Sequence, residues 1–210
     1  MSRLALFLKS DELKVRVRTL LILSTVVFFG STVISMVFCS FLLPRRLLLA
    51  MYSLTGVTTF SSSFFTAMQV IFSNLASVII IVIINQHRFP GKDTDWVPLG
   101  YWCLMWLFAL NGITLGAWFI AATNQVAPTL AGMQHVVFGV IRRIRLCEMI
   151  GKVLIISATA RVAATEERRQ RVPGEQPTTF TLTDPEKLAF AAGAILIVAE
   201  AIVASGLAFA

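Results

Sequence analysis

The longest uncharged run of the chain, residues 97–122, most constrains how the chain can fold. It reads VPLGYWCLMWLFALNGITLGAWFIAA, and none of its 26 residues is Asp, Glu, Lys, Arg or His. A helix of about 20 apolar residues crosses the hydrocarbon core of a bilayer, so this run is long enough to cross with some tilt. Trp102, Trp106 and Trp118 lie toward its ends, where indole rings prefer the headgroup boundary. The run therefore predicts a transmembrane helix.

The middle of this run has the residues of a helix-packing surface. Asn111 and Gly112 are adjacent, and Gly116 follows four residues after Gly112. Two small residues at this spacing let a second helix backbone approach closely, and an amide side chain can hydrogen-bond across the contact. Glycine is also common in membrane helices in general. We favour the packing surface because the glycines and the asparagine occur together.

Composition and charge agree with a membrane location. Hydrophobic residues make up 57% of the chain, charged residues 14%, and the mean hydropathy is +0.80. The net charge of +7 fits cytoplasmic flanks of membrane helices better than a nucleic-acid site. Cys39, Cys103 and Cys147 lie singly in apolar segments, so the sequence predicts no disulfide framework and no zinc motif. No cofactor is expected.

Four more apolar segments accompany the central run. The predicted fold is all-α, a polytopic integral membrane bundle of about five transmembrane helices forming one domain over residues 19–210. A basic amphipathic arm over residues 1–18 precedes it, and a polar loop is expected at residues 165–187. The predicted spans are residues 19–43, 64–84, 97–122, 146–164 and 188–210.

The segment between the third and fourth spans is less regular. Residues 124–146 contain Pro128 and three closely spaced arginines, so we expect only a short re-entrant or interfacial helix at residues 130–141. With five spans and an inside N-terminus, the inner segments hold twelve Lys and Arg and the outer segments five. This asymmetry favours a cytoplasmic N-terminus. A four-span arrangement with residues 124–187 all cytoplasmic is the alternative.

Several polar residues fall inside the predicted spans. Asn74 lies beside a stripe formed by Gln69, Ser73 and Ser77, which should face other helices. Glu148 and Lys152 are four residues apart with the acid first, so they can pair on one helix face.

Glu200 lies near the centre of the last span. A charge in a bilayer costs several kcal/mol unless it is paired or hydrated. One interpretation is structural: Glu148 is bound to Lys152, and Glu200 is protonated or bound to Asn111 or Gln69. The other interpretation is a path for protons or substrate.

The chain lacks the residue patterns of catalysis. Glu166, Glu167 and Arg171 match the start of an intramembrane protease motif, but they belong to a charged run ending at Pro173. The only histidines are His87 and His135, and the common hydrolase and phosphate-loop motifs are absent. We therefore expect a protein that is not an enzyme.

Three segments carry a resemblance to a known family: IFSNLASVIIIVIIN, LFALNGITLGA and LCEMIGKVLIISATARVA. Over residues 71–163 the chain resembles the stage II sporulation protein M family. The equivalent residues would be Asn74, Asn111, Gly112, Gly116 and Glu148. The resemblance implies a helical protein of about five spans that acts through partners, such as a cell-wall hydrolase or a transport ATPase.

Together these features predict a multi-pass protein of the cell membrane that acts as a non-catalytic scaffold or as a subunit of a membrane complex. Its partners would be membrane lipids and other membrane subunits or further copies of itself, with no nucleic acid. The residues expected to make helix-packing or partner contacts are Asn74, Asn111, Gly112, Gly116, Glu148, Lys152 and Glu200. The alternative is a small proton-coupled transporter or channel subunit that uses Glu148 and Glu200.

Overall fold

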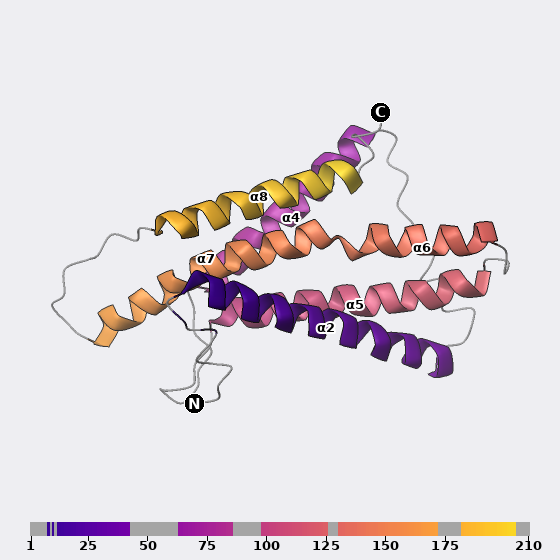
Figure 1. The fold of residues 1–210 in the computed structure, drawn as a ribbon, viewed down its shortest axis with the longest axis horizontal. Coiled ribbons are helices and arrows are strands. Elements are labelled where there is room, and N and C mark those ends of the chain that lie inside the picture. Colours follow the sequence, from indigo (N-terminus) through magenta and orange to yellow (C-terminus); the bar gives the residue numbers. More distant parts are fainter. Residues whose placement is uncertain are drawn as a thin grey trace.

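The chain forms a bundle of long helices (Figure 1). The structure, a computed structural model, describes residues 8, 10, 12–42, 63–85, 98–125, 130–171 and 182–204. This part contains six helices, which are α2 (Leu13–Leu42), α4 (Ser63–Asn85), α5 (Leu99–Gln125), α6 (Leu130–Ile144), α7 (Leu146–Arg171) and α8 (Asp184–Ala204). The predicted all-α class is confirmed.

The helix boundaries differ from the expected ones at three places. Helix α2 begins at Leu13, so the last third of the predicted basic arm, residues 13–18, forms its first turns. Helix α7 runs on to Arg171, into the segment expected to be a loop, because Glu and Arg favour helix and the first proline comes only at Pro173. Helix α8 begins at Asp184. Most of residues 1–11 and all of residues 172–181, which include part of the expected polar loop, lie outside the described residues.

Two helices are long and apolar enough to cross a membrane. They are Leu13–Phe41 within α2 and Leu99–Thr123 within α5. In α4 the apolar stretch Ile71–Ile84 is shorter than these two. Among the described residues, two of the predicted spans therefore satisfy length and composition together, which supports membrane association.

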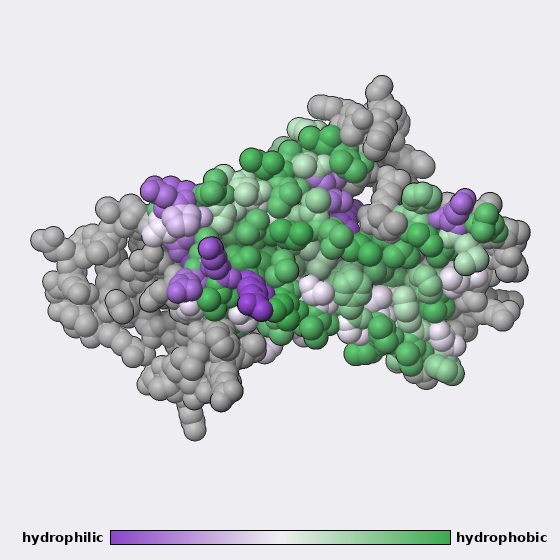
Figure 2. Space-filling model, viewed as in Figure 1, coloured by the Kyte–Doolittle hydropathy of each residue, from purple (hydrophilic) through white to green (hydrophobic). Residues whose placement is uncertain are grey.

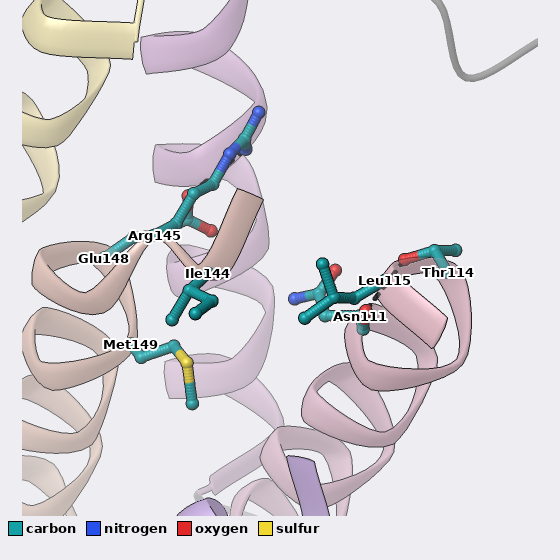
Figure 3. Close-up of a pocket in the computed structure, with 7 residues that line it drawn as sticks. All are labelled: Asn111, Thr114, Leu115, Ile144, Arg145, Glu148 and Met149. Carbon is teal, nitrogen blue, oxygen red and sulfur yellow. Dashed lines mark hydrogen bonds and ion pairs between the residues drawn. The ribbon is translucent and has the colours of Figure 1, made fainter. Parts of the chain in front are cut away.

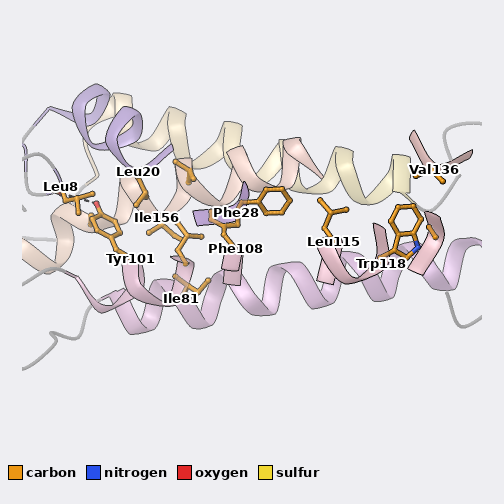
Figure 4. Packing of buried hydrophobic residues seen from close by; sticks show 14 residues of the cluster. Leu8, Leu20, Phe28, Ile81, Tyr101, Phe108, Leu115, Trp118, Val136 and Ile156 are labelled. Carbon is orange, nitrogen blue, oxygen red and sulfur yellow. Dashed lines mark hydrogen bonds between the residues drawn. The ribbon is translucent and has the colours of Figure 1, made fainter. Parts of the chain in front are cut away.

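The helices pack as two main pairs. Helices α2 and α5 lie side by side along most of their length, and α7 and α8 form the second pair (Figure 1). Helix α4 contacts α5, α7 and α8. A continuous apolar core runs between the helices, with Leu8 and Tyr101 at one end and Trp118 and Val136 at the other (Figure 4). Its most deeply buried members include Leu20, Phe28, Leu104, Phe108 and Ile156.

Helices α6 and α7 lie end to end and are separated by one residue, Arg145 (Figure 1). Arg145 has a φ of 48°, in the left-handed region that ends helices. Helix α6 packs against α5 at Gly139, where a Cβ would collide with the indole ring of Trp118. The predicted short helix at residues 130–141 thus extends to Ile144 and, with α7, forms an interrupted helix alongside α5.

The surface is apolar over the middle of the molecule. Figure 2 shows hydrophobic residues covering the centre of the visible face and hydrophilic residues gathered at the end where α2 and α8 begin. Helix α2 exposes a series of large apolar side chains, which are Ile22, Val26, Phe29, Val33, Ile34, Phe38 and Phe41. Exposing such a contiguous apolar surface to water would be unfavourable, whereas lipid chains would keep it out of water.

Candidate site at the α6–α7 break

The first turns of α7 hold a buried ion pair. The Lys152 Nζ lies 2.5 Å from the Glu148 Oε1, and both side chains are almost fully buried. Their spacing of four residues places them on one face of the helix, one turn apart. Glu148 also lies in the first turn of α7, where the positive end of the helix dipole favours an acid.

Asn74 on α4 completes this pair. Its Nδ2 donates to the Glu148 Oε2 over 3.2 Å, and its Oδ1 accepts from the Lys152 Nζ over 3.4 Å. An amide side chain both donates and accepts, so one residue can satisfy both members of an ion pair. The three residues, which we call the Asn74–Glu148–Lys152 network, link α4 to α7.

Arg145 adds a second positive charge to the acid. Its Nη1 lies 3.3 Å from the Glu148 Oε2, and its side chain is 44% exposed. Its carbonyl oxygen accepts from the Met149 N–H, which starts the hydrogen bonding of α7. A non-glycine residue in this backbone region costs about 1–2 kcal/mol, so Arg145 is held there by its surroundings. With Lys152 and Glu148, it gives the site a formal charge of +1.

A pocket of about 200 Å³ opens beside this site. Helix α5 contributes Asn111, Thr114 and Leu115, and the break contributes Ile144, Arg145, Glu148 and Met149. Figure 3 shows Asn111 and Leu115 pointing across the space toward Ile144. Asn111 is near the middle of α5, since that helix runs from Leu99 to Gln125. The break in the α6–α7 helix therefore faces the centre of α5.

The two predicted glycines face a different neighbour from Asn111. A Cβ at Gly112 would collide with the Ser31 Oγ and the Phe28 carbonyl oxygen, and one at Gly116 would lie 2.5 Å from the Thr32 carbonyl oxygen. Both glycines therefore lie where α5 packs tightly on α2. Asn111 was expected to bond across the same contact, but its side chain is exposed at the pocket. The bond that crosses from α2 to α5 comes from the Ser35 Oγ, which donates to the Ile113 carbonyl oxygen over 2.7 Å.

Glu200 lies on α8, where it faces the residue of α7 that directly precedes Glu148. Its neighbour is the thiol of Cys147. The sequence suggested Asn111 or Gln69 as partners, and the side chain of Gln69 lies outside the described residues. About two turns before Glu200, Gly193 packs against Gly151 so closely that a Cβ on either would lie 2.6 Å from the carbonyl oxygen of the other. Gly151 was not singled out from the sequence, although it stands three residues after Glu148.

A second buried ion pair was missed from the sequence. The Arg16 Nη2 lies 2.7 Å from the Glu186 Oε1, and it joins the start of α2 to the start of α8. The Glu186 Oε2 accepts from the Thr183 N–H over 3.0 Å. This is a capping box, and the spacing Thr183-x-x-Glu186, with a proline in the first turn, is its sequence signature. The partner Arg16 has no such signature.

The electrostatics of Glu186 follow from these contacts. This residue precedes the predicted span at residues 188–210. Burial alone raises the pKa of its carboxyl group. The hydrogen bonds from Thr183 and the Arg16 guanidinium outweigh burial, and the pKa lies below its ordinary value. Glu186 is therefore ionised at neutral pH and forms a true ion pair with Arg16.

No protein-family model, curated protein or solved structure matches this chain. Among the residues that the structure describes, no three His, Cys, Asp or Glu side chains gather to hold a metal ion. The site combines a closed ion-pair network, a broken helix and a polar pocket.

Proposed function

We propose that this chain is an integral membrane protein of five crossings, with a cytoplasmic N-terminus, that serves without catalysis as a scaffold or subunit of a membrane complex. The observation that carries the proposal is the Asn74–Glu148–Lys152 network. Both oxygens of Glu148 are engaged, by Lys152 on one side and by Asn74 and Arg145 on the other. A carboxylate held in this way fixes α7 to α4.

The apolar surface and the helix lengths support the membrane location. At 1.5 Å per residue, the 27 residues of α5 extend over about 40 Å, which exceeds a hydrocarbon core of about 30 Å. The exposed apolar side chains of α2 need lipid or another protein to cover them. In this arrangement α6 and the first half of α7 make one interrupted crossing, and α2, α4, α5 and α8 make the others.

The interrupted crossing strengthens the charge asymmetry. Arg142, Arg143 and Arg145 were counted among the outer segments, yet they stand at or next to the α6–α7 break within that crossing. The outer connections then keep only Arg45 and Arg46, against twelve basic residues in the inner ones. This excess supports a cytoplasmic N-terminus.

Cysteine labelling tests the arrangement of crossings. In a variant with Cys39, Cys103 and Cys147 replaced by alanine, single cysteines are placed at Ala5, Ala127 or Thr178. In intact cells, an impermeant thiol reagent should label position 127 and spare positions 5 and 178. Permeabilised cells should give labelling at all three positions. Labelling of position 178 from outside would overturn the five-crossing arrangement, and protection of position 127 would favour four crossings.

The scaffold role itself is tested with a variant that lacks both charges. Glu148→Leu combined with Lys152→Leu removes the pair without leaving an uncompensated charge. If the protein is a scaffold, this variant should be stable, recover its partner subunits in mild detergent and keep its function in cells. A variant that is stable and binds its partners, yet shows the full loss-of-function phenotype, would contradict the scaffold role.

Transport is the second candidate, and one observation favours it. Helices broken near the middle of a membrane form the substrate sites of many transporters, because the break exposes backbone and side-chain polar groups. The α6–α7 break faces a polar pocket at the centre of α5. The same double variant separates the two roles, since loss of flux with retained assembly would indicate a transporter that uses Glu148.

A further inference from the structure

The pocket at the α6–α7 break has the chemistry of an anion site. We propose that it binds a small oxyanion of the carboxylate or phosphate type, with Arg145 as the residue that recognises the charge and Asn111 as a hydrogen-bond donor from the opposite wall. The inference uses the proposed membrane position of α5, and it does not depend on the scaffold role.

Charge balance is the first reason. Glu148 neutralises one of two nearby cations, and its stronger partner by distance is Lys152, at 2.5 Å compared with 3.3 Å for Arg145. The three groups leave one positive charge in excess. Inside a membrane protein such a charge is unfavourable unless an anion or water compensates it. Glu200 does not line the pocket, because it lies beside Cys147, about a quarter-turn around α7 from Glu148.

Available space and donors are the second reason. About 200 Å³ accommodates a small anion with some of its water, since a water molecule takes up about 30 Å³ of liquid volume. Arg145 contacts Glu148 through Nη1, and a guanidinium carries five N–H donors in a planar fork that matches an oxyanion. The Asn111 amide lies across the space, and the apolar side chains of Leu115, Ile144 and Met149 limit its hydration (Figure 3).

The backbone at the break is the third reason. An arginine at a φ of 48° is unfavourable where glycine or asparagine would fit easily. The guanidinium of Arg145 lies at the pocket and its side chain is 44% exposed, while the Asn74–Glu148–Lys152 network is buried. A strained residue beside a polar pocket is typical of a binding site.

Binding is measured on the purified full-length protein in detergent. The melting temperature is recorded in sodium acetate or sodium phosphate against sodium chloride at equal ionic strength. A ligand that binds only the folded state raises the melting temperature as its concentration rises. We expect such a rise for the wild type with at least one of the two oxyanions. Arg145→Gln should lower the affinity about tenfold or more, as expected from losing a charge-assisted hydrogen bond.

Two further variants make the test specific. Arg18→Gln removes the same charge at an exposed position near the start of α2, and it should bind like the wild type. Asn111→Leu keeps every charge, replaces the amide on the opposite wall with an apolar side chain and should also weaken binding. If Arg145→Gln fails to fold, Asn111→Leu alone decides the question.

A lipid phosphate is the other source of the same chemistry. Native mass spectrometry in nanodiscs of phosphatidylglycerol or phosphatidylcholine distinguishes the two sources. Retention of phospholipid by the wild type and its loss in Arg145→Gln would identify a lipid headgroup as the ligand. If neither free anion nor phospholipid binding depends on Arg145 or Asn111, the proposal is wrong. Recovery of partner subunits is a separate measurement, so the anion site and the scaffold role can fail independently.

Discussion

Among the residues that the structure describes, two ion pairs are buried, and they are built in opposite ways. Glu148 and Lys152 stand one turn apart on α7, with a contact of 2.5 Å. Arg16 and Glu186 are 170 residues apart in sequence, and their contact of 2.7 Å joins α2 to α8. In both pairs the side chains are no more than 6% exposed. Burial is therefore the same, and the difference lies in what each pair connects.

The difference shows how a pair of charges can contribute to tertiary structure. The Glu148–Lys152 pair forms as soon as α7 forms, so alone it connects nothing, and Asn74 supplies the link to α4. The Arg16–Glu186 pair is itself the link between two helices. Hydrogen bonds from a neutral side chain thus provide the tertiary contact in one region, and the ion pair provides it in the other.

The largest expected effect is on the local pair. Glu148→Leu leaves the Lys152 ammonium buried with only the Asn74 Oδ1 as partner. We expect a loss of about 3–5 kcal/mol in the free energy of unfolding, because an uncompensated buried charge remains. Adding Lys152→Leu should recover at least half of this loss. Denaturant titration in detergent measures both variants, and a double variant no more stable than the single one would refute the argument.

A smaller loss is expected for the long-range pair. Arg16→Met leaves Glu186 with its hydrogen bond from the Thr183 N–H, so the buried carboxylate keeps one donor. We expect a loss of about 1.5–3 kcal/mol, the value of a hydrogen bond to a charged group. Arg18→Met, at an exposed position on the same helix, is the control and should change stability by less than about 0.5 kcal/mol. Equal effects of the two substitutions would mean that the Arg16–Glu186 contact adds nothing.

The hydrogen bonds of the Asn74 amide should contribute less to the free energy of unfolding than either ion pair. Asn74→Leu removes the hydrogen bonds to Glu148 and Lys152 but leaves those two residues paired. We expect about 1–2 kcal/mol of destabilisation. The matched control is Ser77→Ala, since the Ser77 Oγ bonds only to the Asn74 carbonyl oxygen of its own helix among its described contacts. If Asn74→Leu is as mild as the control, α4 is held to α7 by packing alone.

The mildest test changes pH instead of sequence. Because the pKa of Glu186 is lower in the folded state than in the unfolded chain, its contribution is fully present above the unfolded value of about 4.3. It is lost as the pH falls through the folded pKa. The stability difference between the wild type and Arg16→Met should therefore shrink as the pH falls from about 7 to about 3. A difference that is constant with pH would show that Arg16 acts through packing of its side chain.

How much of this was predictable depends on the distance in sequence over which each feature is determined. Uncharged runs predicted the helices, and the spacing of Glu148 and Lys152 predicted their pair, because helix periodicity is local. The capping box at Thr183 and Glu186 could also be predicted from its spacing, because both residues lie within one helical turn. Arg16 could not be assigned to Glu186, since nothing local marks a partner 170 residues away. The break at Arg145 carries neither glycine nor proline, the usual signals for a helix end.

The Arg16–Glu186 pair has a consequence for how the chain is made. At roughly 5–20 residues per second, the ribosome needs roughly 10–30 s to proceed from residue 16 to residue 186. During that time the first helix has been synthesised while the carboxylate that neutralises its arginine does not yet exist. Arg16 stands at the start of α2, so its guanidinium can remain in the aqueous or headgroup layer while it waits. Its final burial then has to follow the synthesis of α8, so this end of the bundle closes later than the contacts among the earlier helices can form.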